Sequence, residues 1–391
     1  MNALIEKYAR DIGIDPNDYE ALNDWGIVLA EQVETKNGIE ADELWKQAIE
    51  KFAQAIAIKP DLYDAFYNWG NALKDQAKTK TGIEADTLWE QAFEKYAQAI
   101  EIKPERHEAL NNWGNALSDQ AETKTGTEAD ELWKLSIEKY EQAIRLKPDK
   151  YTSFCNWGNA LAEQAKTKIG VEAENLWILA FKKYARATEI QPNDDLSFYN
   201  WGSALDDQAK TKTNIEAEKL WVEAFEKYAQ ALEIKPDKYA ALYNWGNALD
   251  NLALTKTGIE ADELWKQAIE KFTQVVEIKP NKHEALNNWG NVLLNQARTK
   301  TGLQRQRLLE QAREIFMKCH VFQPNDTYNL ACVEALLGHE AECQKWLEHY
   351  VTHDPMPKCE LLTTDTDLDS MRGIAWFQGL MHSASCLPQN E

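Results

Sequence analysis

The sequence predicts an all-α protein built as a stack of repeated helical hairpins. Two observations lead to this fold class: the dipeptide Trp-Gly returns every 44 residues, and each interval holds two segments with the apolar spacing of a helix. A fixed period of this size is typical of stacked repeat proteins. One hairpin cannot bury its own apolar face, so it needs neighbours in the stack.

Three kinds of residue recur at this interval of 44 positions. Trp-Gly begins at Trp25, Trp69, Trp113, Trp157, Trp201, Trp245 and Trp289. A second tryptophan follows at Trp45, Trp89, Trp133, Trp177, Trp221 and Trp265, and Leu309 takes the seventh slot. Prolines keep the same interval, and the segment Gly38–Phe52 recurs letter for letter as Gly258–Phe272. Recent duplication and selection for regular stacking would both produce this identity.

The second unit illustrates the expected hairpin. Asp61 is predicted to cap a first helix, whose small and apolar residues follow the spacing i, i+3, i+4, i+7. Thr81–Glu84 is predicted to form a capping box at the start of a second helix, with the threonine oxygen accepting from the amide of Glu84. This helix should end before Pro104, because proline disfavours helix in the preceding residue. The box or a near variant recurs at Thr125–Glu128, Thr213–Glu216, Thr257–Glu260 and Thr301–Gln304.

The hairpin residues resemble the tetratricopeptide-repeat (TPR) family, whose unit is two antiparallel helices in about 34 residues. The third unit matches the family pattern at Leu110, Trp113, Gly114, Leu117, Ser136, Tyr140, Ala143 and Pro148. The resemblance covers residues 1–350 and implies a right-handed superhelical solenoid. It also implies that the two helices approach closely at small residues such as Gly114 and Ala143.

The repeats depart from the family by ten extra residues, around Glu122–Glu131 in the third unit. We expect these residues to lengthen both helices and to form a polar loop between them, so that the hairpins protrude along one edge. The second tryptophan of each unit lies near this edge. Packing of the extension is the preferred role for it, and an aromatic binding surface is the alternative.

The pattern predicts three regions. Residues 1–16 are expected to be a truncated N-terminal capping helix, and residues 17–324 to hold seven 44-residue repeats. Residues 325–391 are expected to hold a shorter TPR-like repeat at Asp326–Val351, capping helices and a tail. Thr364–Leu380 resembles a closing segment common after bacterial TPR arrays, and a terminal cap is expected because an end repeat must shield its apolar face.

Composition restricts the functional classes. The 64 acidic and 43 basic side chains give a formal charge of −21, which argues against nucleic-acid binding and favours neutral to basic partners. Neither a signal peptide nor a membrane-spanning segment is recognisable, and one cysteine in the first 318 residues is no disulfide framework, so a cytoplasmic protein is expected. No nucleotide-binding loop, nucleophile elbow or His-Glu-x-x-His motif occurs, so an enzyme is not expected. His107 and His283 are interpreted as exposed residues at helix starts.

The C-terminal part of the sequence concentrates cysteine and histidine. The residues are Cys319, His320, Cys332, His339, Cys343, His349, His353 and Cys359. Structural zinc sites usually show tight pairs such as Cys-x2-Cys, and none occurs here. We therefore expect no metal and no cofactor, and keep a metal-bearing C-terminal module as an alternative.

Lysines recur in the loop between the two helices of each unit. Those in register are Lys36, Lys80, Lys124, Lys168, Lys212, Lys256 and Lys300. One interpretation is a solvated loop whose lysines lie near the carbonyl end of the first helix, where the helix dipole favours cations. The other is a basic ridge for an acidic partner or for an acidic face of a second copy.

The resemblance to TPR proteins also implies which residues line the concave groove. The Trp-Gly dipeptide places the position numbers of the TPR unit on this sequence. The sixth positions of the units hold Asn68, Asn112, Asn156, Asn200, Asn244 and Asn288, and the ninth positions hold Asn71, Asn115, Asn159, Asn247 and Asn291. Tyr67, Tyr199 and Tyr243 come from the fifth positions, and Asp75, Asp119 and Asp207 from the thirteenth. Amides offer both donors and acceptors, so a row of them could pair with an extended peptide whatever its side chains. Local bonds within the repeats are the other interpretation.

The preferred function is a non-catalytic scaffold that binds an extended peptide or protein segment along this groove of asparagine, tyrosine and aspartate. A self-assembling structural scaffold, and hence a homo-oligomer, is the first alternative. An accessory subunit with a metal-bearing C-terminal module is the second. The groove lacks the paired lysine and arginine that chaperone-binding TPR proteins use for an acidic C-terminus, which argues against that class of ligand.

Overall fold

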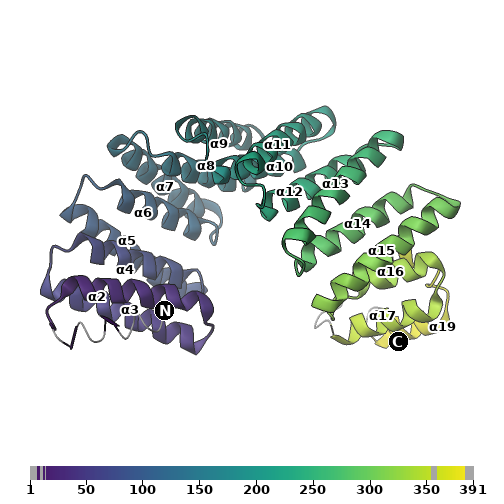
Figure 1. Ribbon diagram of the computed structural model, residues 1–391, viewed down its shortest axis with the longest axis horizontal. Helices are drawn as coiled ribbons and strands as arrows, with labels where there is room; N and C mark the ends of the chain where they lie inside the picture. The colour runs from purple at the N-terminus through teal and green to yellow at the C-terminus, as the bar shows by residue number, and fades with distance from the viewer. Residues whose placement is uncertain (1–6, 9–11, 14, 354–358, 384–391) are drawn as a thin grey trace. The chain divides into compact units, whose positions relative to one another are not determined.

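The protein is a series of antiparallel helical hairpins in the computed structural model, which describes residues 7–8, 12–13, 15–353 and 359–383 (Figure 1). Within these residues there is no β-strand. The predicted all-α repeat architecture is therefore confirmed. Most of the expected capping helix at residues 1–16 lies outside the described part of the chain.

The chain divides into two compact units, Met1–Ala204 and Leu205–Glu391, and each is described by itself. The first helix of each 44-residue repeat, here called helix A, is α2 (Tyr19–Gln32), α4 (Tyr63–Ala77), α6 (His107–Ala121), α8 (Tyr151–Lys166), α10 (Asp195–Lys210), α12 (Tyr239–Leu254) or α14 (His283–Arg298). The second, helix B, is α3 (Ile39–Ile58), α5 (Gly82–Ile102), α7 (Gly126–Leu146), α9 (Gly170–Ile190), α11 (Asn214–Ile234), α13 (Gly258–Ile278) or α15 (Gly302–Phe322). A 3-10 turn, η1 (Val33–Thr35), follows α2. Helix B has 20 or 21 residues, which fits the expected extension at its front.

Close helix contact within a hairpin depends on the glycine of Trp-Gly. A Cβ atom added at Gly114 would lie 2.8 Å from Cε1 of Tyr140, which is too close for real atoms. Ala143, one turn further along α7, is fully buried. The small residues therefore allow helices A and B to approach as the family resemblance implies.

The second tryptophans belong to the core. Trp89, Trp133 and Trp177 each keep only 1% of their surface exposed. In the sixth repeat the indole N–H of Trp265 donates to Asp250 at 2.9 Å. These rings pack the lengthened hairpins, which confirms the structural interpretation and leaves no exposed aromatic surface at these positions.

The hydrogen bonds predicted for the capping boxes are wrong. Thr81 and Thr125 do occupy N-cap positions, but neither side chain accepts a hydrogen bond there. The chain turns into helix B through a residue with positive φ, such as Gly82 at 59°, and Asn214 adopts 54° in the same place. Glu84 pairs with Lys80 instead of reaching back to the threonine amide. Glycine is favoured here because it adopts positive φ without a Cβ clash.

The cap predicted at Asp61 is also absent. Helix α4 begins at Tyr63 with Leu62 at the N-cap, and no side chain caps it. Asp61 therefore stands one residue too early to serve as the cap. In the first repeat Asp18 does cap α2, because its carboxylate accepts from the amide of Ala21 at 2.9 Å.

The C-terminal part of the second unit contains a shorter hairpin and further helical turns. The hairpin is α16 (Tyr328–Leu337) and α17 (Glu340–His353), joined by Gly338 in the left-handed conformation. Then follow α18 (Cys359–Thr364), η2 (Thr366–Leu368) and α19 (Ala375–Ser383). Five side chains of these elements and of the turn before α19 enter the same core as α14–α17: Leu362, Leu368, Met371, Phe377 and Met381. These contacts agree with a capping role for the closing segment, while the domain boundaries stay a prediction.

Candidate functional site on the first helices of the repeats

Within each unit the sixth-position amides lie on successive helices A, and the amino groups of five of them bond to the preceding repeat: Asn68, Asn112, Asn156, Asn200 and Asn288. Nδ2 of Asn112 donates to Tyr67 at 2.8 Å and to Oδ1 of Asn71 at 2.9 Å. In the second unit Asn288 donates to Tyr243 at 3.0 Å and to Asn247 at 2.7 Å. Asn68 donates to Asn23, Asn156 to Asn111, and Asn200 to Sγ of Cys155. These side chains thus join successive helices A.

The ninth-position amides use their oxygens within the protein. Oδ1 of Asn71 accepts from the hydroxyl of Tyr96 at 2.8 Å, and Asn115 and Asn159 accept in the same way from Tyr140 and Tyr184. The side chain of Asn71 also bonds to Tyr67, whereas the amino groups of Asn115 and Asn159 make no bond of their own among the described residues. The row therefore offers donors rather than the balanced donors and acceptors that the sequence suggested.

Every predicted groove residue lies on a helix A. The amides are half-buried, as are Tyr67, Tyr199 and Tyr243, so the row is partly accessible. Asn244 on α12 and Asn291 on α14 also belong to these predicted groove residues. Burial raises the pKa of Tyr67, so its hydroxyl stays protonated at neutral pH.

The predicted carboxylates are already paired with lysines. Asp119 contacts Lys78 of the preceding repeat at 3.1 Å, and Asp75 contacts Lys74 at 3.0 Å. Asp207 contacts Lys210 at 3.2 Å. Exposed pairs of this kind are weak, so a basic ligand could exchange with the lysine.

The lysines in register are clamps between repeats. Nζ of Lys80 lies 2.8 Å from Asp42 of the preceding repeat and 3.2 Å from Glu84 of its own. The same double pairing recurs for Lys124, Lys168 and Lys256. The hydrogen bond to Asp42 is the first cause that raises the pKa of Lys80. The edge therefore carries ion pairs and not an uncompensated basic ridge.

A cavity of about 540 Å³ lies where the first two repeats meet, in the first unit. Ile27, Trp45 and Phe52 give it apolar walls. Asn68, Asn71 and Asp75 of the predicted groove also line it, beside Glu31, Ala30 and the loop that holds Lys36. Three of the predicted binding residues thus line this cavity, and another, Asp119, lines a second cavity of about 530 Å³ between the second and third repeats.

Sequence reasoning missed this cavity, although a signal was present. In the second repeat Tyr96 bonds to Asn71, whereas the matching positions of the first repeat hold Phe52 and Ile27. Both partners of one polar contact are thus replaced together by apolar residues. A paired replacement of this kind in an otherwise regular repeat indicates that the surroundings of the two residues differ from those in the other repeats.

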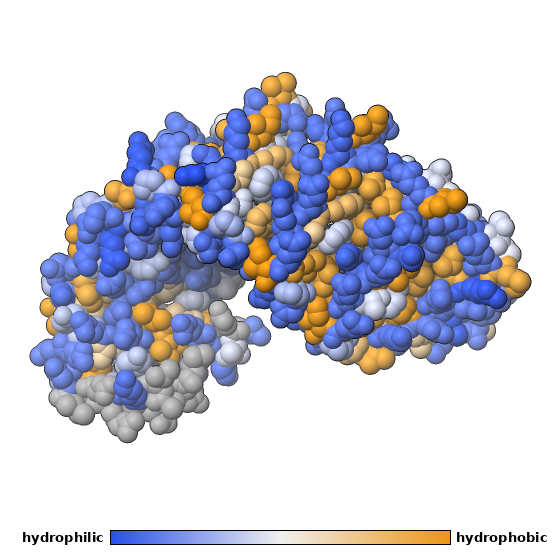
Figure 2. All heavy atoms as spheres, turned by 45° about the horizontal axis from the view of Figure 1, so that its top comes forward, coloured by the Kyte–Doolittle hydropathy of each residue, from blue (hydrophilic) through white to orange (hydrophobic). Residues whose placement is uncertain are grey.

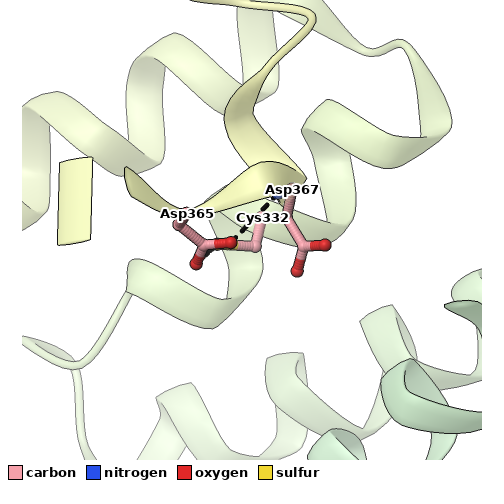
Figure 3. A group of neighbouring side chains, drawn as sticks. All are labelled: Cys332, Asp365 and Asp367. Carbon is pink, nitrogen blue, oxygen red and sulfur yellow. Dashed lines mark hydrogen bonds between the residues drawn. The ribbon is translucent and has the colours of Figure 1, made fainter. Parts of the chain in front are cut away.

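Cys319, Cys332 and Cys343 of the second unit are buried thiols. Burial raises the pKa of Cys319 to about 11 and that of Cys343 to about 12. Cys332 lies beside Asp365 and Asp367 (Figure 3). A thiol must ionise to bind a metal, and burial raises the pKa of Cys332.

The two carboxylates beside Cys332 have protein partners. Asp367 is 4% exposed and forms an ion pair with Arg298 of α14. Asp365 accepts from the hydroxyl of Tyr328 at 2.8 Å. The group therefore fits a lock between the closing segment and α14–α16 better than a metal centre.

The two histidines at helix starts differ from their predicted exposure. His107 and His283 begin α6 and α14 as expected. Both are half-buried, however, with 15% and 34% of their side chains exposed. Burial is the first cause that lowers the pKa of His107.

The comparison with protein families shows to which family the chain belongs. One family, described as "Plant specific mitochondrial import receptor subunit TOM20", matches residues 5–108, 63–153, 101–199, 181–254 and 240–337. The chain belongs to this family, which is of the TPR type. Its overlapping matches follow the succession of hairpins, so the family resemblance seen in the sequence is confirmed.

Solved structures of TPR proteins are also similar to this chain. YrrB, described as "a TPR protein with an unusual peptide-binding site", has 17% identity and a TM-score of 0.36, with 61% of this chain and 98% of YrrB covered. MamA has 14% identity and a TM-score of 0.37, covering 55% and 93%. PilF of Pseudomonas aeruginosa has 14% identity and a TM-score of 0.43, covering 68% and 96%. No curated protein matches the chain.

Proposed function

We propose that the chain is a non-catalytic scaffold that binds an extended peptide segment of another protein along its helices A. The cavity between the first two repeats carries the proposal, because Asn68, Asn71 and Asp75 of the predicted groove line it. Membership of a TPR-type family supports a protein partner. The family's description as an import receptor supports a role in holding a polypeptide segment.

The available groups define the ligand. Amino groups of Asn71, Asn115 and Asn159 can donate to the carbonyl oxygens of an extended backbone, while their own oxygens are engaged by tyrosines. The carboxylates and the formal charge of −21 favour lysine or arginine over acidic residues in the ligand. The apolar walls of the cavity favour one large apolar side chain in the segment.

The location of the protein stays a proposal. The composition and the cysteine pattern favour the cytoplasm. The family description names mitochondrial import, and we carry from it only the general role of binding a segment of another protein. No described helix combines the length and the apolar composition that crossing a bilayer requires.

Selection of random unstructured peptides on the purified protein tests the proposal. The informative variant is Asn71→Asp, because a carboxylate still accepts from Tyr96 and Asn112 but has no amino group to donate. Gln91→Glu on the exposed side of α5 adds the same charge and serves as the control. We expect neutral peptides to enrich on the native and control proteins and to weaken on Asn71→Asp. If no peptide enriches on the native protein, the proposed function is wrong.

One observation favours self-assembly as a second candidate. Aliphatic side chains stand exposed just after the turn into helix B at Ile39, Ile83, Val171, Ile215, Ile259 and Leu303, between 67% and 89% accessible. On the face in Figure 2, hydrophilic residues dominate and hydrophobic ones are scattered among them. Light scattering of the native protein and of Ile39→Ser/Ile83→Ser tests this candidate. A monomer at all concentrations contradicts it.

A further inference from the structure

Trp45 in the first repeat has a polar group without a partner. Its ring is 5% exposed and packs in one core cluster with Leu29, Phe52 and Ala72. Nε1 of Trp45 is buried and makes no hydrogen bond among the described residues. A buried donor that lacks an acceptor costs free energy. An acceptor supplied by a bound molecule would remove this cost.

Two later repeats show which group accepts from the same tryptophan position. In the fifth repeat the indole N–H of Trp221 donates to Oδ1 of Asp206 at 3.0 Å, across fifteen residues of sequence. In the sixth, Trp265 makes the same bond to Asp250 over the same interval. The matching position of the first repeat holds Ala30, whose side chain offers no acceptor. The first repeat therefore keeps the donor and lacks the oxygen that accepts from it.

The cavity of about 540 Å³ between the first two repeats borders both positions. Trp45 and Ala30 each line it. Alanine is shorter than aspartate by a carboxylate group, so the side chain at position 30 does not fill the space that this group takes in the fifth and sixth repeats. An oxygen that enters the cavity beside Ala30 can therefore take the position that the Asp206 carboxylate has beside Trp221.

The third repeat shows that an unpaired indole N–H is not enough to indicate a site. Nε1 of Trp133 is also buried without a hydrogen bond among the described residues. The matching residue there is Ser118, whose hydroxyl lies 2.7 Å from that of Ser136 and bonds to the carbonyl of Gly114. Trp133 lines neither the cavity of the first two repeats nor that of the second and third. The cavity distinguishes Trp45, and Trp133 provides a matched control.

The charges around the cavity favour a neutral acceptor over an anion. The charged residues that line it are Glu31, Asp42, Asp75, Lys36 and Lys80. Nζ of Lys36 lies 2.9 Å from Glu40, so this ammonium group is already paired. Nζ of Lys80 lies 2.8 Å from Asp42 and is paired as well. A ligand carboxylate would have to break one of these pairs near three carboxylates of the protein, whereas a neutral carbonyl oxygen needs no cation.

We propose that Nε1 of Trp45 donates to a neutral carbonyl oxygen of the bound segment, which enters this cavity beside Ala30. The inference rests on the peptide-binding function set out above, and it adds the recognising residue and the group that is recognised. The oxygen belongs to the peptide backbone or to the side-chain amide of asparagine or glutamine, because both are the same kind of acceptor. The apolar walls hold the carbon atoms beside it.

Nuclear magnetic resonance of the full chain with ¹⁵N-labelled tryptophan tests the contact. The probe is N-acetyl-leucine N-methylamide, which is uncharged and combines an apolar side chain with two carbonyl oxygens. The Trp45→Phe variant assigns the indole signal of Trp45 by its loss. We expect the probe to move this signal downfield and to leave that of Trp133 in place, whereas protonated isopentylamine, which has no acceptor, should not move it downfield. No movement of the Trp45 signal, or equal movement of the Trp133 signal, overturns the proposal.

The affinity of a peptide selected on the native protein measures the same contact. We expect Trp45→Phe to weaken binding about two- to tenfold, as for the loss of one neutral hydrogen bond, and Trp133→Phe to leave it unchanged. Replacing each asparagine or glutamine of the peptide by leucine separates a side-chain oxygen from a backbone one. Thermal unfolding of both variants checks that the repeats remain folded.

The two experiments separate this inference from the proposed function. Equal affinity of the native protein and Trp45→Phe for the selected peptide overturns the inference and leaves the proposed function standing. If no peptide enriches on the native protein, the proposed function is wrong. The response of the Trp45 signal to the blocked leucine amide then still decides whether this N–H takes a carbonyl oxygen in the cavity.

Discussion

The first and second repeats share the same helical hairpin but differ at one contact between helices A and B. In the second, the hydroxyl of Tyr96 bonds to Asn71, which also accepts from Asn112 of the third repeat. In the first, Phe52 and Ile27 stand at the matching positions and border the cavity. The tyrosine–asparagine contact joins helices A and B of one hairpin, and Asn112 links that hairpin to the next. A cavity of about 530 Å³ also lies between the second and third repeats, where this contact is kept. The apolar pair of the first repeat therefore changes the walls that a cavity offers to a ligand.

The largest effect should come from the tryptophans of helix B. Trp133 is 1% exposed, and we expect Trp133→Ala to lower the free energy of unfolding by about 3–5 kcal/mol. Trp45→Ala should cost less, because this ring already borders a cavity on one side. Urea denaturation followed by circular dichroism measures both. An equal or larger loss for Trp45→Ala would remove the distinction between the repeats.

The next effect concerns the glycines of Trp-Gly. In Gly70→Ala the new Cβ would lie 2.8 Å from the ring of Tyr96, and we expect a loss of about 1–3 kcal/mol by overpacking. Gly26→Ala meets the ring of Phe52, which has the cavity beside it and can move. Its cost should be smaller, and thermal unfolding of the two variants compares them. A more harmful Gly26→Ala would show that the cavity gives no freedom.

A smaller effect is expected from the polar contact itself. Tyr96→Phe removes one hydrogen bond to Asn71 and should cost about 0.5–1.5 kcal/mol. Phe52→Tyr alone should destabilise the first repeat, because its hydroxyl faces Ile27, and Ile27→Asn should restore part of the loss. A double-mutant cycle measures this coupling. Strict additivity of the two substitutions would argue against the pairing.

The smallest effect should come from the clamp lysines. Lys80→Met removes ion pairs to Asp42 and Glu84 and should lower the melting temperature slightly at low salt. The difference should disappear near about 1 M salt, where such charges are screened. The pKa of Lys80 is raised in the folded state. The contribution of its ion pairs to stability is therefore present at neutral pH, and it is lost as the pH rises above the ordinary pKa of lysine and through the raised one. A loss that ignores salt would assign Lys80 a packing role instead.

The sequence predicts the repeat architecture well, because the periodic tryptophans and glycines report directly on helix packing. Gly114 shows why: its position in the pattern is required by the ring of Tyr140. The helix starts were harder to predict, since Thr81 has the right residue type for a cap while Gly82 determines the backbone turn. Local patterns name the elements but not which of two adjacent residues governs the conformation.

The candidate site was only partly predictable. The amide row lies on helices A as expected, yet the partners of Asn112 and Lys80 come from other repeats and depend on how the hairpins stack. The cavity depends on the side chains Ile27 and Phe52, which look like ordinary core residues in the sequence. Charge and residue type alone do not reveal which groups are already engaged within the protein.

The most direct test of the account is the affinity of a selected peptide for a protein whose cavity is filled. Ala30→Trp places an indole at the cavity wall, and Gln91→Trp adds the same ring on the exposed side of α5, outside the cavity. Fluorescence anisotropy of the labelled peptide compares both variants with the native chain. We predict that Ala30→Trp weakens binding at least about tenfold, or 1.4 kcal/mol, while Gln91→Trp binds as the native protein does. Equal affinity for all three proteins would contradict the claim that this cavity anchors the ligand.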